Sequence, residues 1–160
     1  MDATIRPYAT GDRDAVVDVM VLAEMFARED APFLEDALDR HLTAPATESR
    51  CLVATRDDLI VAAVLARAEE ATDRVWDLTM IGVRPDQQRN GDGRALMRAI
   101  EKTLTEDDAR LILVRTSSTD QFAPARTFYD SLGYYETARI DDYWTAGDDL
   151  VVFRRTLTRT

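Results

Sequence analysis

The chain has few residues of the kinds that build disulfides and metal sites. Its 160 residues include one cysteine, Cys51, and one histidine, His41. A single cysteine excludes an intrachain disulfide, and the strand-like segment RCLVAT around it favours a small buried residue over a reactive thiol. A single histidine excludes a His-rich metal site, so we expect no bound metal. The helical spacing of His41 from Leu38 favours a helix surface or cleft edge over catalysis.

Long apolar runs are also missing. No stretch of the sequence is long and apolar enough to span a bilayer. The first twelve residues, MDATIRPYATGD, lack the basic start and apolar run of a signal peptide. We therefore expect a cytoplasmic protein with no membrane partner, built as a single domain over residues 1–160.

Lysine is nearly absent, because Lys102 is the only one among 20 basic residues. Acidic residues number 30, most of them aspartate, and the formal net charge is −10. An acidic, lysine-poor surface suits a high-salt cytoplasm, where salt screens the repulsion between like charges. GC-rich codon usage, which favours Arg, Asp and Ala, explains the same composition equally well. With either origin, the negative charge disfavours nucleic acid and anionic lipid as partners.

The hydrophobic pattern predicts an α/β fold with a mixed sheet. The predicted order is β-α-α-β-β-β-α-β-α-β-β. Strands are expected at 4–8, 50–56, 59–67, 74–83, 109–117, 134–144 and 150–157. Helices are expected at 11–29, 31–44, 93–104 and 123–133, the last one ended by Gly133.

A glycine-rich turn lies where the strand at 74–83 gives way to the helix at 93–104. The segment VRPDQQRNGDGRALM carries Gly91 and Gly93 between basic residues. Glycines let backbone N–H groups curl toward a ligand at the positive end of a helix, so this joint is a predicted phosphate cradle. It lacks the third glycine of the dinucleotide fingerprint and the lysine of the P-loop, which disfavours a nucleotide-binding domain.

The same segment closely resembles the acyl-CoA-binding signature of the GNAT superfamily of N-acetyltransferases, which reads Q/R-x-x-G-x-G/A after a strand ending in V-x-P. Downstream, APARTFYDSLGY resembles the family segment A-x-x-F/L-Y-x-x-x-G-F/Y. The element order also matches, so the resemblance covers essentially the whole chain. It implies a mixed, mostly antiparallel sheet flanked by helices, in which the strand at 109–117 splays away to open a V-shaped cleft.

The resemblance implies that acetyl-CoA is the co-substrate. Backbone groups of Ile81, Gly82 and Val83 would hold the pantetheine arm like an added strand. The pyrophosphate would be wrapped by the turn, with Gln88, Arg89, Asn90, Gly91, Asp92, Gly93 and Arg94 as the binding residues. One departure is Asp92, since the family usually has an apolar or basic residue between the glycines. Its carboxylate costs affinity for a diphosphate unless it points to solvent or pairs with arginine.

For catalysis, the resemblance places Tyr129 near the thioester sulfur. A phenol has a pKa of about 10 and can protonate the departing thiolate. The alternative is that Phe128 and Tyr129 simply pack their helix against the sheet. The backbone N–H near Val83 would stabilise the oxyanion.

Asp77 is the candidate general base. It lies six residues before Val83, at the spacing of a base glutamate in histone-acetylating members of the family. In a regular strand it would share one face with Thr79 and Ile81, and partial burial would raise its pKa. The alternative is a strand-edge aspartate that is hydrated or paired with arginine. Three further residues are candidates for contact with the acceptor: Asp141, Asp142 and Tyr143. We favour the simpler interpretation that they belong to the general acidic surface.

The sequence therefore predicts an N-acetyltransferase that moves an acetyl group from acetyl-CoA to a primary amine by direct transfer in a ternary complex. The alternative is a catalytically weak acyl-CoA-binding or regulatory module on the same fold. The acceptor amine could belong to a small molecule or a protein. The resemblance also makes a homodimer a reasonable expectation.

If the acidic surface is a halophilic adaptation, removing salt leaves many like charges unscreened. We expect Tm to rise substantially between dilute buffer and molar KCl, measured by calorimetry at fixed pH. A Tm that is flat across this range would contradict halophily and support codon usage as the origin of the composition.

Overall fold

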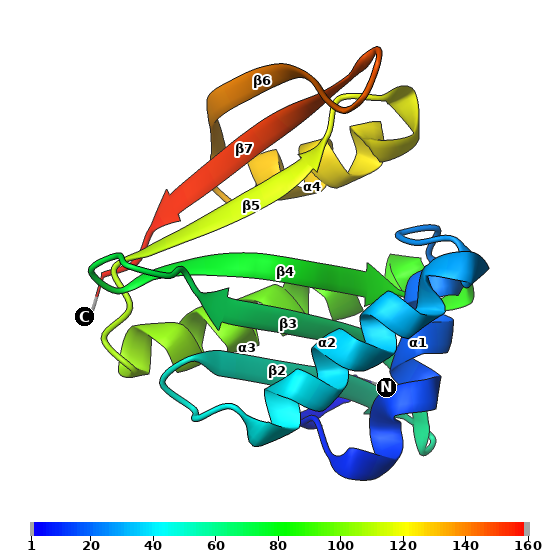
Figure 1. Ribbon diagram of the computed structural model, residues 1–160. Coiled ribbons are helices and arrows are strands. Elements are labelled where there is room, and N and C mark those ends of the chain that lie inside the picture. Colours follow the sequence, from blue (N-terminus) through cyan, green and yellow to red (C-terminus); the bar gives the residue numbers. More distant parts are fainter. Residues whose placement is uncertain (1, 159–160) are drawn as a thin grey trace.

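The computed structural model describes residues 2–158, without the side chain of Arg89 (Figure 1). Its strands are β1 (Thr4–Pro7), β2 (Ser49–Arg56), β3 (Leu59–Ala68), β4 (Val75–Val83), β5 (Leu111–Ser117), β6 (Tyr135–Thr145) and β7 (Asp148–Thr156). Its α-helices are α1 (Arg13–Leu22), α2 (Ala31–Thr43), α3 (Asp92–Glu106) and α4 (Ala123–Ser131). Short 3₁₀ helices are η1 (Thr10–Asp12), η2 (Arg28–Asp30), η3 (Pro85–Asn90) and η4 (Asp120–Phe122). The predicted order of strands and α-helices is confirmed.

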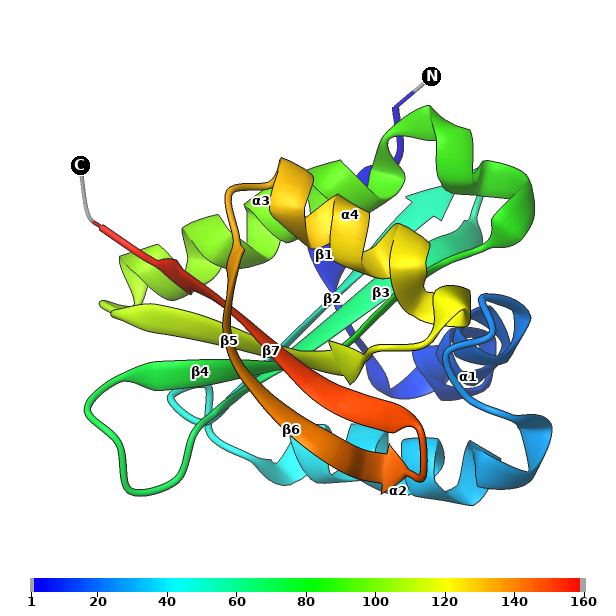
Figure 2. The same cartoon turned by 90° about the horizontal axis from the view of Figure 1, so that it is seen from above.

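The strands form one sheet in the order β1-β2-β3-β4-β5-β7-β6. The sheet is mostly antiparallel, as expected, and β4 and β5 form its parallel pair. Helices α1 and α2 cover one face, and α3 and α4 lie on the other (Figures 1 and 2). A separate apolar cluster fills each side. Of the helices within residues 2–158, none is long and apolar enough to cross a membrane.

The parallel pair β4–β5 ends early. Its register joins Val75–Leu78 to Leu111–Val114, although β4 continues to Val83 and β5 to Ser117. Beyond this point β5 stays paired with β7, and the β5-β7-β6 part of the sheet turns away from β4 (Figure 1). The V-shaped opening that the family resemblance implied is therefore present.

A β-bulge in β4 corrects the expected face pattern. Leu65 is opposite Met80 and Ala66 is opposite Leu78, so Thr79 is an extra residue on β4. A bulge shifts the alternation of side chains. Ile81 consequently packs in the α3-side cluster with Trp76 and Leu78, and Asp77 lies on the opposite face, which carries α1 and α2. The expectation that Asp77 and Ile81 share one face was wrong.

Helix α1 ends at Leu22, several residues before the end of the predicted 11–29 helix. Glu24 adopts a left-handed conformation with φ of 59°, and the amides of Glu24 and Met25 donate to Val21 and Met20 oxygens at 3.0 Å each. These two bonds form a Schellman cap, which terminates a helix without a proline or glycine. The following residues, 23–25, are thereby free to line the opening at the end of β4.

Gly82 marks a close approach between α1 and β4. A Cβ atom added to Gly82 would lie 2.7 Å from Met20 Sδ and 3.6 Å from Ala23 Cβ. Met20 is fully buried, so its thioether has little room to move. Glycine is therefore required here by packing.

We expect Gly82→Ala to destabilise the protein by about 1–3 kcal/mol, because the added methyl overpacks the contact with Met20. Chemical denaturation of both proteins measures the difference. Gly11→Ala is the matched control, since a Cβ there meets nothing within 4 Å, and its change should stay within about 0.5 kcal/mol. Equal stability of Gly82→Ala and the parent would contradict the close-packed contact.

Candidate functional site

A cavity of about 590 Å³ opens where β4 and β5 separate. One wall is the unpaired end of β4, from Ile81 to Val83, and a second is the glycine turn. The other walls come from η4 and α4 and from residues 23–25 after α1. Because the β5-facing edge of β4 has no neighbouring strand in this stretch, its peptide groups are available to a ligand.

The two glycines of the turn serve different needs. Gly91 has φ of +79°, in the left-handed region, and forms the N-cap of α3. Gly93 has ordinary backbone angles, but a Cβ there would lie 3.2 Å from Val83 Cγ2 and 3.5 Å from the Phe128 ring. Gly91 thus shapes the turn, and Gly93 lets α3 begin directly against β4 and α4. The first amides of α3 have no partners within the helix and carry its positive dipole.

Seven of the ten predicted cofactor-binding residues line the cavity: Ile81, Gly82, Val83, Gln88, Gly91, Gly93 and Arg94. Gln88 also donates to the Val83 carbonyl oxygen at 3.3 Å, which holds η3 against the strand. Arg94 donates to Ser131 Oγ at 3.0 Å and ties α3 to α4. Asn90 instead donates to Gln87 Oε1 at 3.1 Å, away from the cavity lining. The predicted contact of the Arg89 side chain lies outside the described part of the structure.

Asp92 is buried and paired with Arg56 at the end of β2. Both its oxygens accept from the Arg56 guanidinium, each at 2.8 Å, and the Asp92 side chain is only 4% exposed. Asp92, the unusual acid between the glycines, is therefore paired with an arginine. This is one of the two arrangements that would avoid a loss of affinity for the diphosphate. The Asp92 carboxylate belongs to a brace between β2 and α3, and only its backbone remains for the turn.

Tyr129 is both a core residue and a wall of the cavity. Its ring packs against Phe128, Tyr134 and Phe153, with centroids 5.6–6.0 Å apart. No hydrogen bond joins its hydroxyl to another residue within 2–158, and burial raises the pKa of the phenol above its ordinary value. Tyr129 therefore packs in the core and also borders the cavity.

The C-terminus of α4 is closed by Gly133, as the sequence predicted. Gly133 has φ of +91°, and the Tyr134 amide donates to the Tyr129 carbonyl oxygen at 3.1 Å. This bond completes a Schellman cap. The backbone of Tyr129 is therefore held by the helix end itself.

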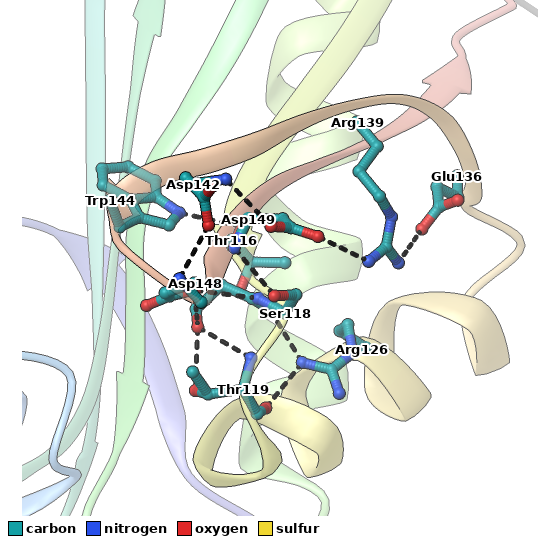
Figure 3. A network of polar contacts seen from close by, with 12 residues as sticks. Thr116, Ser118, Thr119, Arg126, Glu136, Arg139, Asp142, Trp144, Asp148 and Asp149 are labelled. Carbon is teal, nitrogen blue, oxygen red and sulfur yellow. Dashed lines mark hydrogen bonds and ion pairs between the residues drawn. The ribbon is translucent and has the colours of Figure 1, made fainter.

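The N-terminal end of α4 is held by a polar network that the sequence analysis missed (Figure 3). Arg126 donates to the carbonyl oxygens of Ser117 and Thr119 at 2.7 and 2.8 Å. Asp148, from the start of β7, accepts from Ser117 Oγ at 2.6 Å and from the Ser118 amide at 3.2 Å. The end of β5, the β6–β7 hairpin and α4 are thus one polar-bonded unit. No local sequence signal marks it, because Asp148 lies 31 residues after Ser117 in the chain.

Asp77 does not line the cavity, and the structure places it in an ion pair. Arg115 Nη1 donates to its Oδ1 at 2.7 Å, and Thr79 Oγ1 donates to its Oδ2 at 3.2 Å. Arg115 also contacts Glu69, at 3.1 Å. Burial raises the pKa of Asp77, and the Arg115 charge opposes that rise. Asp77 therefore combines features of both alternatives: partial burial, and pairing with arginine.

The acceptor-side candidates lie near the β6–β7 hairpin. Asp142 Oδ1 accepts from the Gly147 amide at 2.7 Å, so this carboxylate stabilises the hairpin turn (Figure 3). Tyr143 is half-exposed and meets Trp144 edge-on, with centroids 4.8 Å apart. Asp141 is exposed. Within residues 2–158, no group of three or more His, Cys, Asp or Glu side chains is arranged to hold a metal ion.

The geometry agrees with comparisons to known proteins. Residues 47–136 match the acetyltransferase (GNAT) domain family. The chain is also similar to a mycothiol acetyltransferase from Thermomonospora curvata, with 35% identity over 105 residues. That alignment covers 64% of this chain and 34% of the relative, so the chain spans about a third of that protein.

Solved structures share the whole fold. A protein from Desulfovibrio desulfuricans assigned to the GNAT family has a TM-score of 0.91 and 28% identity, over 98% of this chain and 99% of that one. An aminoglycoside 6′-N-acetyltransferase complexed with coenzyme A has a TM-score of 0.78 at 16% identity, over 98% of each chain, which is a likeness of fold. With the family match extending over more than half of its residues, the chain belongs to the GNAT family of acetyltransferases.

Proposed function

We propose that this protein is an N-acetyltransferase that transfers an acetyl group from acetyl-CoA to a primary amine, with both substrates bound at once. The observation that carries the proposal is the cavity between β4 and β5, which brings the free edge of β4, the glycine turn and Tyr129 together. A cleft open between two strands can admit one substrate from each side of the sheet.

The lining of the cavity fits acetyl-CoA. The unpaired edge of β4 offers peptide groups to the amides of a pantetheine arm. Gly91, Gly93 and the first turn of α3 offer N–H groups and a positive dipole to a diphosphate, with Arg94 beside them. The pairing of Asp92 with Arg56 removes the repulsion that a free carboxylate would cause. Acetyl-CoA would supply the activated acetyl thioester.

Tyr129 is assigned as the general acid. A raised pKa keeps its phenol protonated at neutral pH, as a proton donor must be. Its hydroxyl has no acceptor among the described residues, so it is available to a sulfur atom in the cavity. The backbone amide near Val83 would donate to the carbonyl oxygen of the thioester.

Asp77 is assigned as the general base, acting on the acceptor amine from the face that carries α2. An alkylamine with a pKa near 10 is protonated at neutral pH and must lose a proton before it attacks. Burial favours a stronger base, and the Arg115 contact holds the carboxylate in one orientation. Because Asp77 lies outside the cavity lining, a bridging water would carry the proton.

We expect Tyr129→Phe to lower turnover about a hundredfold with near-normal acetyl-CoA affinity, because the phenol acts mainly in the transition state. Steady-state rates of thiol release, with a calorimetric titration of acetyl-CoA, measure the two effects. Tyr135→Phe, at an exposed tyrosine on β6, is the matched control and should behave like the parent. Turnover of Tyr129→Phe within a few-fold of the parent would mean that Tyr129 only packs.

The same assay separates the enzyme from the alternative acyl-CoA-binding module. A panel of amines that gives no thiol release, together with tight binding of acetyl-CoA, would favour the binding module.

For Asp77→Asn, we expect a turnover defect that is largest below the pKa of the acceptor amine and shrinks above it. At high pH the amine deprotonates without help, so the base is no longer needed. A pH profile of turnover measures this. Asp14→Asn, at an exposed aspartate of α1 that does not line the cavity, is the comparison variant and should leave turnover unchanged at every pH. A constant defect in Asp77→Asn would assign Asp77 a structural role.

A further inference from the structure

A second cavity, of about 520 Å³, lies under the C-terminal end of α2. Its walls come from α2, the start of β2, the end of β3 and the loop that follows β3. Helix α2 lies over β2 and β3 on this face of the sheet (Figure 1). None of the residues predicted from the sequence to bind acetyl-CoA lines this cavity.

The floor of this cavity continues a row of side chains across three strands. Ser49 on β2 is opposite Arg67 on β3, and Arg67 is opposite Asp77 on β4. Directly opposite residues in antiparallel strands point to the same face of a sheet. The row therefore leads from the second cavity to the proposed general base.

Arg67 is a half-buried cation without a carboxylate partner in the described part of the chain. Asp77 and Asp36 act on it only at longer range, and neither forms an ion pair with it. Burial and the nearby Arg40 charge lower the pKa of Arg67. A buried charge is costly unless it is paired, so this guanidinium gains most from an anion that enters the cavity.

His41 adds a second polar group to the same floor. Its Nδ1 lies 2.6 Å from the hydroxyl of buried Ser49, and its ring meets the edge of Tyr8 with centroids 5.8 Å apart. Burial, Arg67 and Arg50 lower the pKa of the imidazole. The pKa of His41 therefore depends on the nearby positive charge that an incoming anion would neutralise.

The acidic residues that line the cavity leave Arg67 without an ion pair, because each of them is paired elsewhere or exposed. Glu69 is occupied, because Arg115 Nη1 and Nη2 contact its two oxygens at 3.4 and 3.1 Å. Glu48 and Glu70 are exposed at the rim, as is Arg40, which pairs with Asp36 at 3.1 Å. Exposed charges are screened by solvent far more than Arg67 is.

We propose that this second cavity binds a carboxylate or phosphate group through Arg67 and His41, and that this group belongs to the acceptor. The anion site follows from the cavity alone. The assignment of the anion to the acceptor rests on the proposed function, because Arg67 neighbours Asp77. The acceptor is then an amine that also carries an acidic group, with the amine near Asp77 and the acid on Arg67.

The anion site is tested on the full chain without acetyl-CoA. His41 is the only histidine, so its imidazole proton resonances are assigned without mutagenesis and report its pKa. Replacing chloride by phosphate or acetate at constant ionic strength should raise that pKa by about 1 unit, because a nearby anion favours the imidazolium. The shift should vanish in Arg67→Gln and persist in the control Arg28→Gln, an exposed arginine that does not line the cavity. No shift with either anion in the parent would overturn the site.

The acceptor is tested with matched amines and a thiol-release assay. β-Alanine is compared with propylamine for a carboxylate, and O-phosphoethanolamine with ethanolamine for a phosphate. In at least one of these two pairs, kcat/KM of the acid-bearing amine should exceed that of its neutral partner by about tenfold. Arg67→Gln should remove the difference. Equal or lower values for both acid-bearing amines would overturn the assignment of the anion to the acceptor. If none of the four amines is acetylated, the assignment of the anion to the acceptor is also overturned, and the result counts against the proposed function. The His41 titration tests the anion site independently of both.

Discussion

The early end of the β4–β5 pairing is the constraint on which the rest of the structure depends. Four residues of each strand are paired, and the remaining lengths diverge. A strand that loses its neighbour leaves unpaired peptide groups, which cost free energy unless a ligand or water takes them. The fold thus creates an edge with free peptide groups inside its own sheet, and the polar network at the end of β5 ties that strand to the β6–β7 hairpin and to α4 (Figure 3).

Two carboxylates near the cleft have arginine partners from other elements. Asp92 pairs with Arg56 of β2, and Asp77 pairs with Arg115 of β5. In a chain with a net charge of −10, these local pairs reduce the negative charge beside a site expected to bind a diphosphate. Arginine suits the task because its planar guanidinium can engage both oxygens of one carboxylate, as it does at Asp92. Arg67 differs from these arginines, because it lines a cavity without forming an ion pair to any described residue.

Two Schellman caps shape the cavity between β4 and β5. The cap at Glu24 ends α1 early and releases residues 23–25 to line the cavity, while the cap at Gly133 holds the backbone of Tyr129. Only the second was predictable, because Gly133 is the residue that favours the left-handed conformation. Glutamate carries no such preference, so the predicted helix ran on through Glu24.

The sequence by itself determined the element order, the glycine turn at Gly91 and the position of Tyr129 in its helix, because these depend on local periodicity and turn chemistry. Tertiary structure alone decided the Arg56 partner of Asp92, the bulge at Thr79 that separates the faces of Asp77 and Ile81, and the contact that requires glycine at Gly82. The reason is physical: each of these depends on which distant segment packs alongside, and one sequence carries no periodic signal for that pairing.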